Sequence, residues 1–155
     1  MSEENLNFSL EIEGTSNRCP TGEVIAKQNQ AGGKIPVLSC EGACIRGEIA
    51  RQAANIVAKD ERYNRACHGE LLTVPESAFA NWVENSEKVV LIDGCFMRCQ
   101  GRILENLLGK DKLVQFDALS HYKKYTDLFE IEDVPMAERI EVANDVADWV
   151  ISSIA

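Results

Sequence analysis

Paired cysteines are the residues of this chain of 155 amino acids whose type and spacing best suit chemistry. The stretch SCEGAC contains Cys40 and Cys44, which are four positions apart. The stretch DGCFMRC repeats that spacing with Cys95 and Cys99. A fifth thiol, Cys67, stands directly before a histidine in the stretch ACHGE. In a chain that keeps its thiols reduced, this many cysteines require an explanation other than disulfide bonds. Metal binding, catalysis and burial are the candidate explanations.

Three interpretations fit this spacing. Zinc takes four Cys or His ligands, and structural zinc sites use pairs with two to four residues between the ligands. An iron–sulfur cluster also uses four cysteines, and the spacing does not separate it from zinc. Low-pKa thiols at helix starts can instead attack disulfides or be oxidised, although thioredoxin-like motifs have two residues between the cysteines rather than three. Burial explains any one cysteine alone. The two pairs together favour a metal site, with zinc as the first choice and a thiol-dependent oxidoreductase or redox sensor as the alternative.

Five thiols compete for the four places of such a site. We expect the ligands to be Cys40, Cys44, Cys95 and Cys99, or the same set with Cys67 replacing one member. Three protein ligands and a water would make the site catalytic rather than structural.

Several polar residues beside the thiols are auxiliary candidates. His68 is a further ligand, a proton carrier or a plain neighbour of Cys67. Asp93 is expected to cap a helix with its carboxylate, or else to orient a ligand through a hydrogen bond. Arg46 and Arg98 lie near the predicted helix starts, where a cation opposes the helix dipole. They either hold an anion there, such as a thiolate cluster or an acidic ligand, or point into solvent.

The elements that position these residues follow from the apolar pattern. Strands are predicted at 34–40, 66–74, 88–93 and 112–119. Helices are predicted at 45–57, from Pro75 to about 85, through 99–108 with Gly109 as the C-terminal cap, and from near Pro135 to the end. The last helix is expected to bury one stripe formed by Met136, Ile140, Ala143, Ala147, Val150 and Ile154. The segment 120–134 is expected to be irregular.

Alternating strands and helices predict an α/β fold of three layers, with helices on both faces of a four-stranded, mostly parallel sheet. The expected strand order is 2-1-3-4, a flavodoxin/Rossmann-like arrangement. In that order the first and third strands are neighbours, and their carboxyl ends flank the crevice where such sheets bind ligands. Right-handed crossovers put the helices that follow them on opposite faces. Cys40 and Cys95 should therefore face one crevice from two sides.

Composition limits the partners and the location of the protein. The net charge of −9 disfavours non-specific binding to nucleic acid and to an anionic membrane surface. No apolar run approaches the roughly 20 residues that a membrane helix needs, and the acidic first residues do not resemble a signal peptide. We therefore expect a cytoplasmic protein without a nucleic-acid or membrane partner. The sequence names no small-molecule or protein partner, and a homodimer is compatible with it.

Two regions are expected along the chain. Residues 1–34 are polar, end in the Gly-rich stretch NQAGGK and read as a partly ordered N-terminal arm. Residues 35–155 read as a single α/β domain, a size at which a chain buries enough surface to need no disulfides. Cys19 falls in the arm and His121 in the irregular segment, and neither is assigned to the site.

The stretches VVLIDGCFMRC, SCEGACIRGEIARQAANIVA and ACHGE together resemble the DGC-domain family, which is named for the tripeptide found here at 93–95. The resemblance covers about residues 35–155 and implies a zinc-binding role for Cys40, Cys67, Cys95 and Cys99. The family's common first loop has two residues between its cysteines, whereas here Ala43 holds the second cysteine's position and Cys44 comes one later. The resemblance implies no known reaction.

Overall fold

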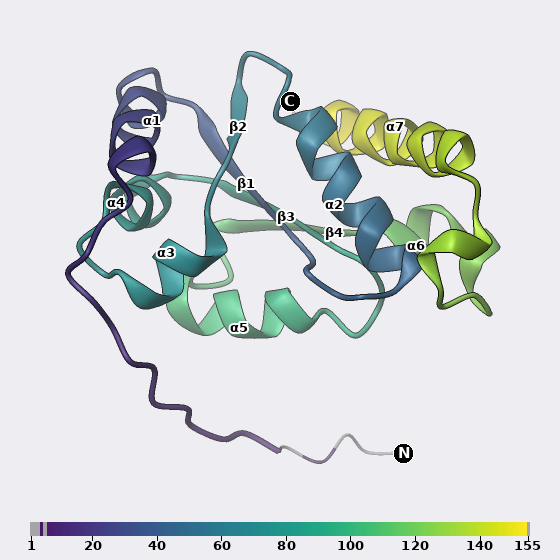
Figure 1. The fold of residues 1–155 in the computed structure, drawn as a ribbon, viewed down its shortest axis with the longest axis horizontal. Helices are drawn as coiled ribbons and strands as arrows, with labels where there is room; N and C mark the ends of the chain where they lie inside the picture. Colours follow the sequence, from purple (N-terminus) through teal and green to yellow (C-terminus); the bar gives the residue numbers. More distant parts are fainter. Residues whose placement is uncertain (1–3, 5, 155) are drawn as a thin grey trace.

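A four-stranded sheet forms the centre of the computed structural model, which describes residues 4 and 6–154 (Figure 1). Its strands are β1 (Ile35–Ser39), β2 (Tyr63–Arg65), β3 (Val89–Asp93) and β4 (Leu113–Asp117). All three strand pairs are parallel, and the order is β2-β1-β3-β4. The whole of β3 is buried, as a central parallel strand should be. The predicted strand order is confirmed.

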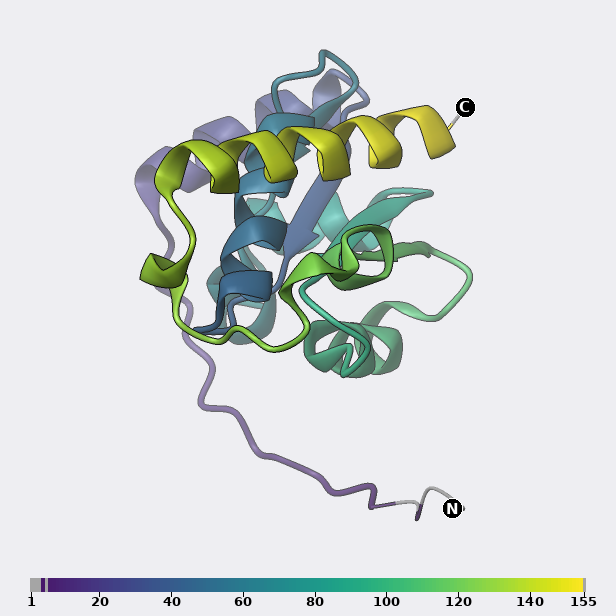
Figure 2. The same cartoon turned by 90° about the vertical axis from the view of Figure 1, so that its right-hand side faces the viewer.

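Helices cover both faces of this sheet and make the three expected layers (Figure 2). The helices are α1 (Pro20–Ala31), α2 (Ile45–Val57), α3 (His68–Thr73), α4 (Ala78–Asn85), α5 (Cys99–Leu108), α6 (Ala118–His121) and α7 (Met136–Ser153), with short 3-10 turns at Lys123–Tyr125 and Ile131–Asp133. α2 and α7 pack on one face, and α1, α4 and α5 pack on the other. No described helix is long and apolar enough to cross a membrane.

The apolar residues of the sheet divide between two cores. Val37 and Val90 face α2 and α7, whereas Leu38 and Leu91 face α4 and α5. Because strand side chains alternate between faces, a short run of consecutive apolar residues supplies both cores. This two-sided burial fixes β1 and β3 side by side and thereby fixes where their carboxyl ends lie.

The predicted second strand at 66–74 is wrong. The strand is Tyr63–Arg65, and most of the predicted segment forms α3, with Cys67 as its N-cap. A short apolar run such as LLTV suits a buried strand and a short helix equally well, so its periodicity did not decide between them. Cys67 consequently lies beyond the strand end rather than within the strand.

Two helix details also differ from the prediction. Ser77 caps α4 by accepting a hydrogen bond from the backbone N–H of Ala80, so the helix begins after Pro75 rather than at it. On α7 the buried stripe includes Val142 and Val146, whereas Met136 and Ile140 are largely exposed. The predicted stripe was rotated at its beginning, where Arg139 is the buried residue instead.

Residues 20–31 of the N-terminal region form α1, and Cys19 is the N-cap residue of this helix. The Cys19 thiol accepts a hydrogen bond from the N–H of Gly22 at 3.3 Å, and Pro20 occupies the first helical position. Ala26 and Asn29 of this helix are buried. Gly33 follows with a left-handed φ of 66°, so the Gly-rich stretch serves as the turn between α1 and β1.

Candidate functional site

Thiols follow three neighbouring strands of the sheet at their carboxyl ends. Cys40 comes directly after β1, and its N–H donates to the carbonyl of Ile92 in β3 at 2.9 Å. Cys95 follows β3, and Cys67 follows β2. All three thiols are free and half-buried. Strand order therefore brings three cysteines from distant parts of the chain to one end of the sheet: Cys40 and Cys95 follow their strands as predicted, whereas Cys67 was predicted to lie within a strand.

The loop after β1 and the loop after β3 touch each other through two glycines. A methyl group added at Gly94 would lie 2.8 Å from the backbone nitrogen of Gly47, a distance that real Cβ atoms do not reach. One added at Gly47 would lie 2.5 Å from the carbonyl oxygen of Gly42. Both positions require glycine because backbone, rather than a movable side chain, occupies the space. The glycine of the Asp-Gly-Cys tripeptide thus holds the two cysteine loops together.

Cys40 lies inside this contact. Its thiol sulfur accepts a hydrogen bond from the N–H of Gly42 at 3.1 Å. Burial raises the pKa of the Cys40 thiol, and the nearby N–H groups of Gly42 and Gly94 oppose that rise without cancelling it. Cys40 is therefore held as a protonated thiol in the absence of a cation.

Cys44 has the opposite protonation tendency. It is the N-cap residue of α2. Burial alone would raise the pKa of its thiol, but the N–H groups of Gly47 and Arg46 and the guanidinium of Arg46 outweigh burial and lower the pKa. The guanidinium also donates to the carbonyl of Thr126 at 3.4 Å, which positions it near the thiol. Of the two thiols in the first loop, Cys44 is the easier to deprotonate.

Asp93 holds the start of α5. Its carboxylate accepts hydrogen bonds from the backbone N–H groups of Gln100 at 3.2 Å and Gly101 at 3.1 Å. The side chain is only 2 % exposed, and burial raises the pKa of this carboxyl although the two N–H groups oppose the rise. The capping interpretation of Asp93 agrees with this geometry. The positive end of α5 is thus occupied by a carboxylate and not by a thiolate.

Arg98 and Cys99 complete the second loop, and neither faces the first. Arg98 has a left-handed backbone with φ of 48°, and its guanidinium binds Gln115 of β4 at 2.9 Å and the carboxylate of Glu105. Cys99 is exposed, and Arg102 approaches its sulfur at 3.8 Å. The second cysteine pair is therefore split between a half-buried Cys95 and an exposed Cys99.

His68 joins the end of β1 to α3. Its Nε2 accepts a hydrogen bond from the N–H of Ser39 at 3.1 Å, so the neutral ring carries its proton on Nδ1. Burial lowers the pKa of His68, which favours this neutral form, while the charge of Glu41 opposes the shift. His68 would have to give up the Ser39 contact to bind a metal through Nε2.

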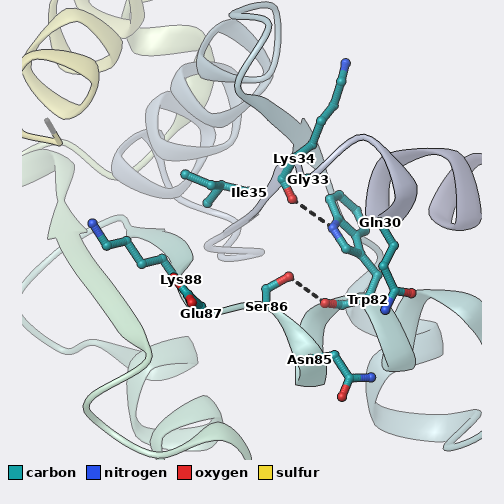
Figure 3. A pocket seen from close by; sticks show the side chains of 9 residues that line it. All are labelled: Gln30, Gly33, Lys34, Ile35, Trp82, Asn85, Ser86, Glu87 and Lys88. Carbon is teal, nitrogen blue, oxygen red and sulfur yellow. Dashed lines mark hydrogen bonds between the residues drawn. The ribbon is translucent and has the colours of Figure 1, made fainter.

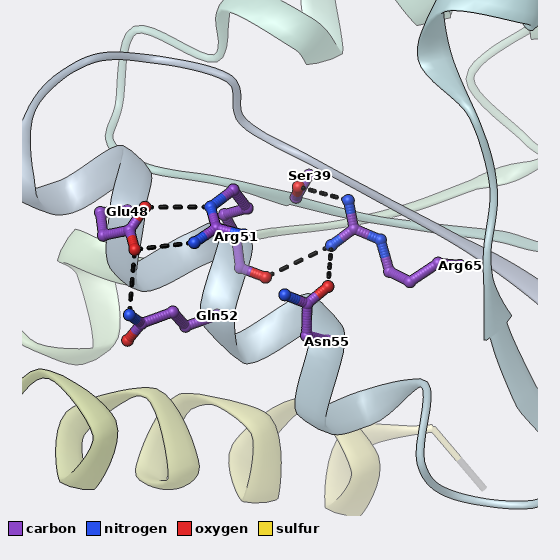
Figure 4. A network of polar contacts seen from close by, with 6 residues as sticks. All are labelled: Ser39, Glu48, Arg51, Gln52, Asn55 and Arg65. Carbon is purple, nitrogen blue, oxygen red and sulfur yellow. Dashed lines mark hydrogen bonds and ion pairs between the residues drawn. The ribbon is translucent and has the colours of Figure 1, made fainter.

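A polar network beside the thiols was not predicted (Figure 4). Arg65 of β2 donates to the hydroxyl of the fully buried Ser39 at 3.1 Å and to Asn55 of α2 at 3.0 Å. Glu48 of α2 binds Arg51 in the next turn of the same helix at 2.8 Å. The sequence feature that could have indicated this network is Ser39, a serine that ends an otherwise apolar strand. The network fixes the end of β1, from which the first cysteine loop begins.

The donors suit a metal in kind but are not gathered around one point. Among residues 4 and 6–154, no three His, Cys, Asp or Glu side chains lie close enough together to hold one metal ion. Thiols and a neutral imidazole are what zinc prefers. Cys19, at the start of α1, and His121, stacked on Trp149 at 4.8 Å, lie outside the site, as their sequence context suggested.

Two of the cavities among the described residues lie beside the sheet. The larger, of about 410 Å³, opens at the amino ends of the strands, where Trp82 donates to the carbonyl of Lys34 (Figure 3). It contains no cysteine. The second, of about 370 Å³, lies at the carboxyl end of β4 and is lined by Asp93, Arg98, Gln115, Phe116, Asp117, Ser120 and Trp149. Only this second cavity is adjacent to a cysteine loop.

The fold and the placement of the thiols define a class: a three-layer α/β protein with cysteines at the carboxyl ends of three adjacent parallel strands. The family model of the DGC domain matches residues 36–142. The chain therefore belongs to the DGC-domain family. No curated protein and no solved structure matches the chain.

Proposed function

We propose that the protein binds zinc through thiolates at the carboxyl ends of β1, β2 and β3. The observation that carries the proposal is the convergence of Cys40, Cys67 and Cys95 on one end of the sheet from three separate segments. Cys44 and Cys99 are the candidates for the fourth ligand. Zinc binds thiolates, so the cytoplasm, which keeps thiols reduced, is the compartment we propose.

Binding requires movement of the loops, because three donors do not yet meet at one point. The N–H groups near Cys40 and the charge of Arg46 near Cys44 support thiolates there once a cation offsets the burial of Cys40. The chemistry that zinc would supply when bound is stabilisation of the deprotonated thiols. Membership of the DGC-domain family supports the same role.

Metal analysis of untagged protein, purified without chelator and with its free thiols counted, tests this proposal. We expect about one equivalent of zinc, which the single variants Cys40→Ser, Cys67→Ser and Cys95→Ser each lose. Cys19→Ser is the matched control, because that thiol is also free but lies at the start of α1. Comparing Cys44→Ser with Cys99→Ser identifies the fourth ligand.

Less than about a tenth of an equivalent of any transition metal, with thiols intact, contradicts the proposal. A brown colour and visible absorption after anaerobic purification would instead identify an iron–sulfur cluster in the same thiols.

A reactive thiol is the second candidate function, and the lowered pKa of Cys44 favours it. A thiolate beside an arginine at a helix start is the environment of redox-active cysteines. In a thiol–disulfide exchange, the Cys44 thiolate would attack one sulfur of a disulfide substrate, form a mixed disulfide and release the other sulfur as a thiolate.

Alkylation followed by mass spectrometry at each cysteine separates this candidate from simple metal binding. Cys44 should react at a lower pH than Cys40, and Arg46→Gln should move the Cys44 profile to higher pH. Arg46→Lys, which keeps the charge, should restore part of the difference. Equal profiles for the two thiols in zinc-free protein would exclude the reactive-thiol function.

A further inference from the structure

The described residues 6–13, before α1, have the sequence pattern of a β-strand but are not part of the described sheet. Apolar side chains alternate with polar ones along Leu6, Phe8, Leu10 and Ile12, and these four are 77, 86, 74 and 48 % exposed. We call residues 6–13 the arm. Figures 1 and 2 both show it running clear of the domain. Strict alternation is the pattern of a strand with one buried face, so the apolar face formed by these four side chains is exposed where a strand would bury it.

The free edge of β4 lacks a neighbour in the same way. β4 is the last strand of the sheet, and Val89 donates to the carbonyl of Lys112 on its inner side. Because successive residues of a strand point their N–H and C=O groups to alternate sides, those of Leu113 and Gln115 point away from the sheet. An exposed edge of this kind is a template for an added strand.

The side chains around this edge suit the arm. The cavity of about 370 Å³ at the end of β4 exposes part of Phe116 and Trp149, which pack edge to face with ring centroids 5.1 Å apart. An apolar side chain of an added strand could enter it. Lys110, directly before β4 in the chain, is an exposed cation near this edge. Its charge is opposite to that of the acidic arm, which carries Glu11 and Glu13.

The length of the arm favours the edge of a second molecule over that of its own. The chain is tied to the domain where Thr15 donates to the carbonyl of Thr73 in α3, the helix that follows β2. β2 and β4 are opposite edges of the sheet, about 14 Å apart, and α5, about 10 Å across, covers β3 and β4 on that face. An extended arm of about eight residues spans roughly 27 Å, so the crossing would leave few residues to pair.

We infer that the arm adds to the β4 edge of a second copy of this chain, and that two copies exchange arms in a symmetric dimer. Each arm supplies the neighbour that the other copy's edge lacks, which closes the assembly at two chains. The arm's apolar face then covers the groove of Phe116 and Trp149.

The test uses the full chain and two variants of neighbouring arm residues. Leu10→Glu places a charge on the apolar face, and Ser9→Glu places the same charge on the polar face. Light scattering after size exclusion, over a wide range of micromolar concentrations, should show a dimer for the wild type and for Ser9→Glu. Leu10→Glu should weaken the dimer by at least about tenfold. Hydrogen exchange should show the Leu113 and Gln115 amides protected in the wild type and exposed in Leu10→Glu.

Three results would overturn the inference. A wild-type monomer with exposed Leu113 and Gln115 amides means that the arm does not pair with the edge. A monomer with those amides protected means that the arm pairs within its own chain. A dimer that Leu10→Glu does not weaken uses another surface.

Discussion

The two strand–loop–helix units that carry the cysteine pairs begin their helices with different chemical groups. α2 begins at the thiol of Cys44, whose pKa the helix start and Arg46 lower. α5 begins under the carboxylate of Asp93, which already accepts two of its free N–H groups. A helix start can activate a thiol only where no better anion occupies it. The first unit therefore carries the thiol that is easier to deprotonate, whereas the Asp93 cap fixes the position of the second unit.

The largest expected effect comes from removing the contact that joins these units. Gly94→Ala should lower the free energy of unfolding by about 2–4 kcal/mol, because the added methyl meets the backbone of Gly47 in the other unit at 2.8 Å. Gly47→Ala should cost a similar amount, because its methyl meets the backbone of Gly42 within the first unit at 2.5 Å. Urea denaturation measures this loss.

Gly69→Ala is the control for those variants. Its methyl would meet nothing closer than the Cys67 sulfur at 3.9 Å, so stability should stay the same or rise by up to about 1 kcal/mol. If Gly94→Ala unfolds within about 0.5 kcal/mol of the wild type, the two loops do not depend on each other.

A smaller effect should separate the two helix starts. Asp93→Ala leaves two N–H groups of α5 without their acceptor and should cost about 1–2 kcal/mol, with faster exchange of the Gln100 and Gly101 amides. Cys44→Ala should cost less than about 1 kcal/mol, since α2 has no side-chain cap hydrogen bond there. Equal losses for the two variants would show that the helix starts are not used differently.

The smallest expected effect is on the pH dependence of stability, and it involves one carboxylate in α2 and one in α5. Hydrogen bonds from Arg51 lower the pKa of Glu48 in α2, and those from Gln115 and Arg98 lower the pKa of Glu105 in α5. Each carboxylate is easier to protonate in the unfolded chain, so its contribution is complete above about pH 4.5 and is lost as the pH falls through the lowered value.

Comparing urea midpoints near pH 5.5 and pH 3.5 tests this dependence. Glu48→Gln and Glu105→Gln should each reduce the fall in the free energy of unfolding between these two pH values. The reduction should be at most about 0.5 kcal/mol, because both sites are solvated. Glu105→Gln should also free Arg98, whereas Glu48 has its partners within its own helix. A larger acid loss in either variant than in the wild type would reverse the sign of the argument.

The fold was predictable because β1 and β3 are largely apolar and the chain between them shows helical periodicity. Few topologies are compatible with that pattern. The ends of those strands placed Cys40 and Cys95 correctly. The same reasoning failed at 66–74, where six residues of short helix carry too little periodicity to be distinguished from a strand.

The finer features of the site depend on contacts between residues far apart in the chain. The repeated spacing grouped Cys95 and Cys99 as one pair of ligands, but Cys95 lies before the helix and Cys99 begins it, with a left-handed Arg98 between them. The Ser39–Arg65 contact and the Gly47–Gly94 contact each join two segments, and no local pattern encodes them.

The Gly47–Gly94 contact also bears on the order of folding. It joins the first crossover connection, from β1 to β2, with the third, from β3 to β4, and a contact of such large sequence separation forms only after both connections have closed. The cysteine end of the sheet is thus expected to assemble late, after the local helices. During that interval the thiols remain open to solvent, so a metal ion could bind to the folding chain and be enclosed as the two loops come together.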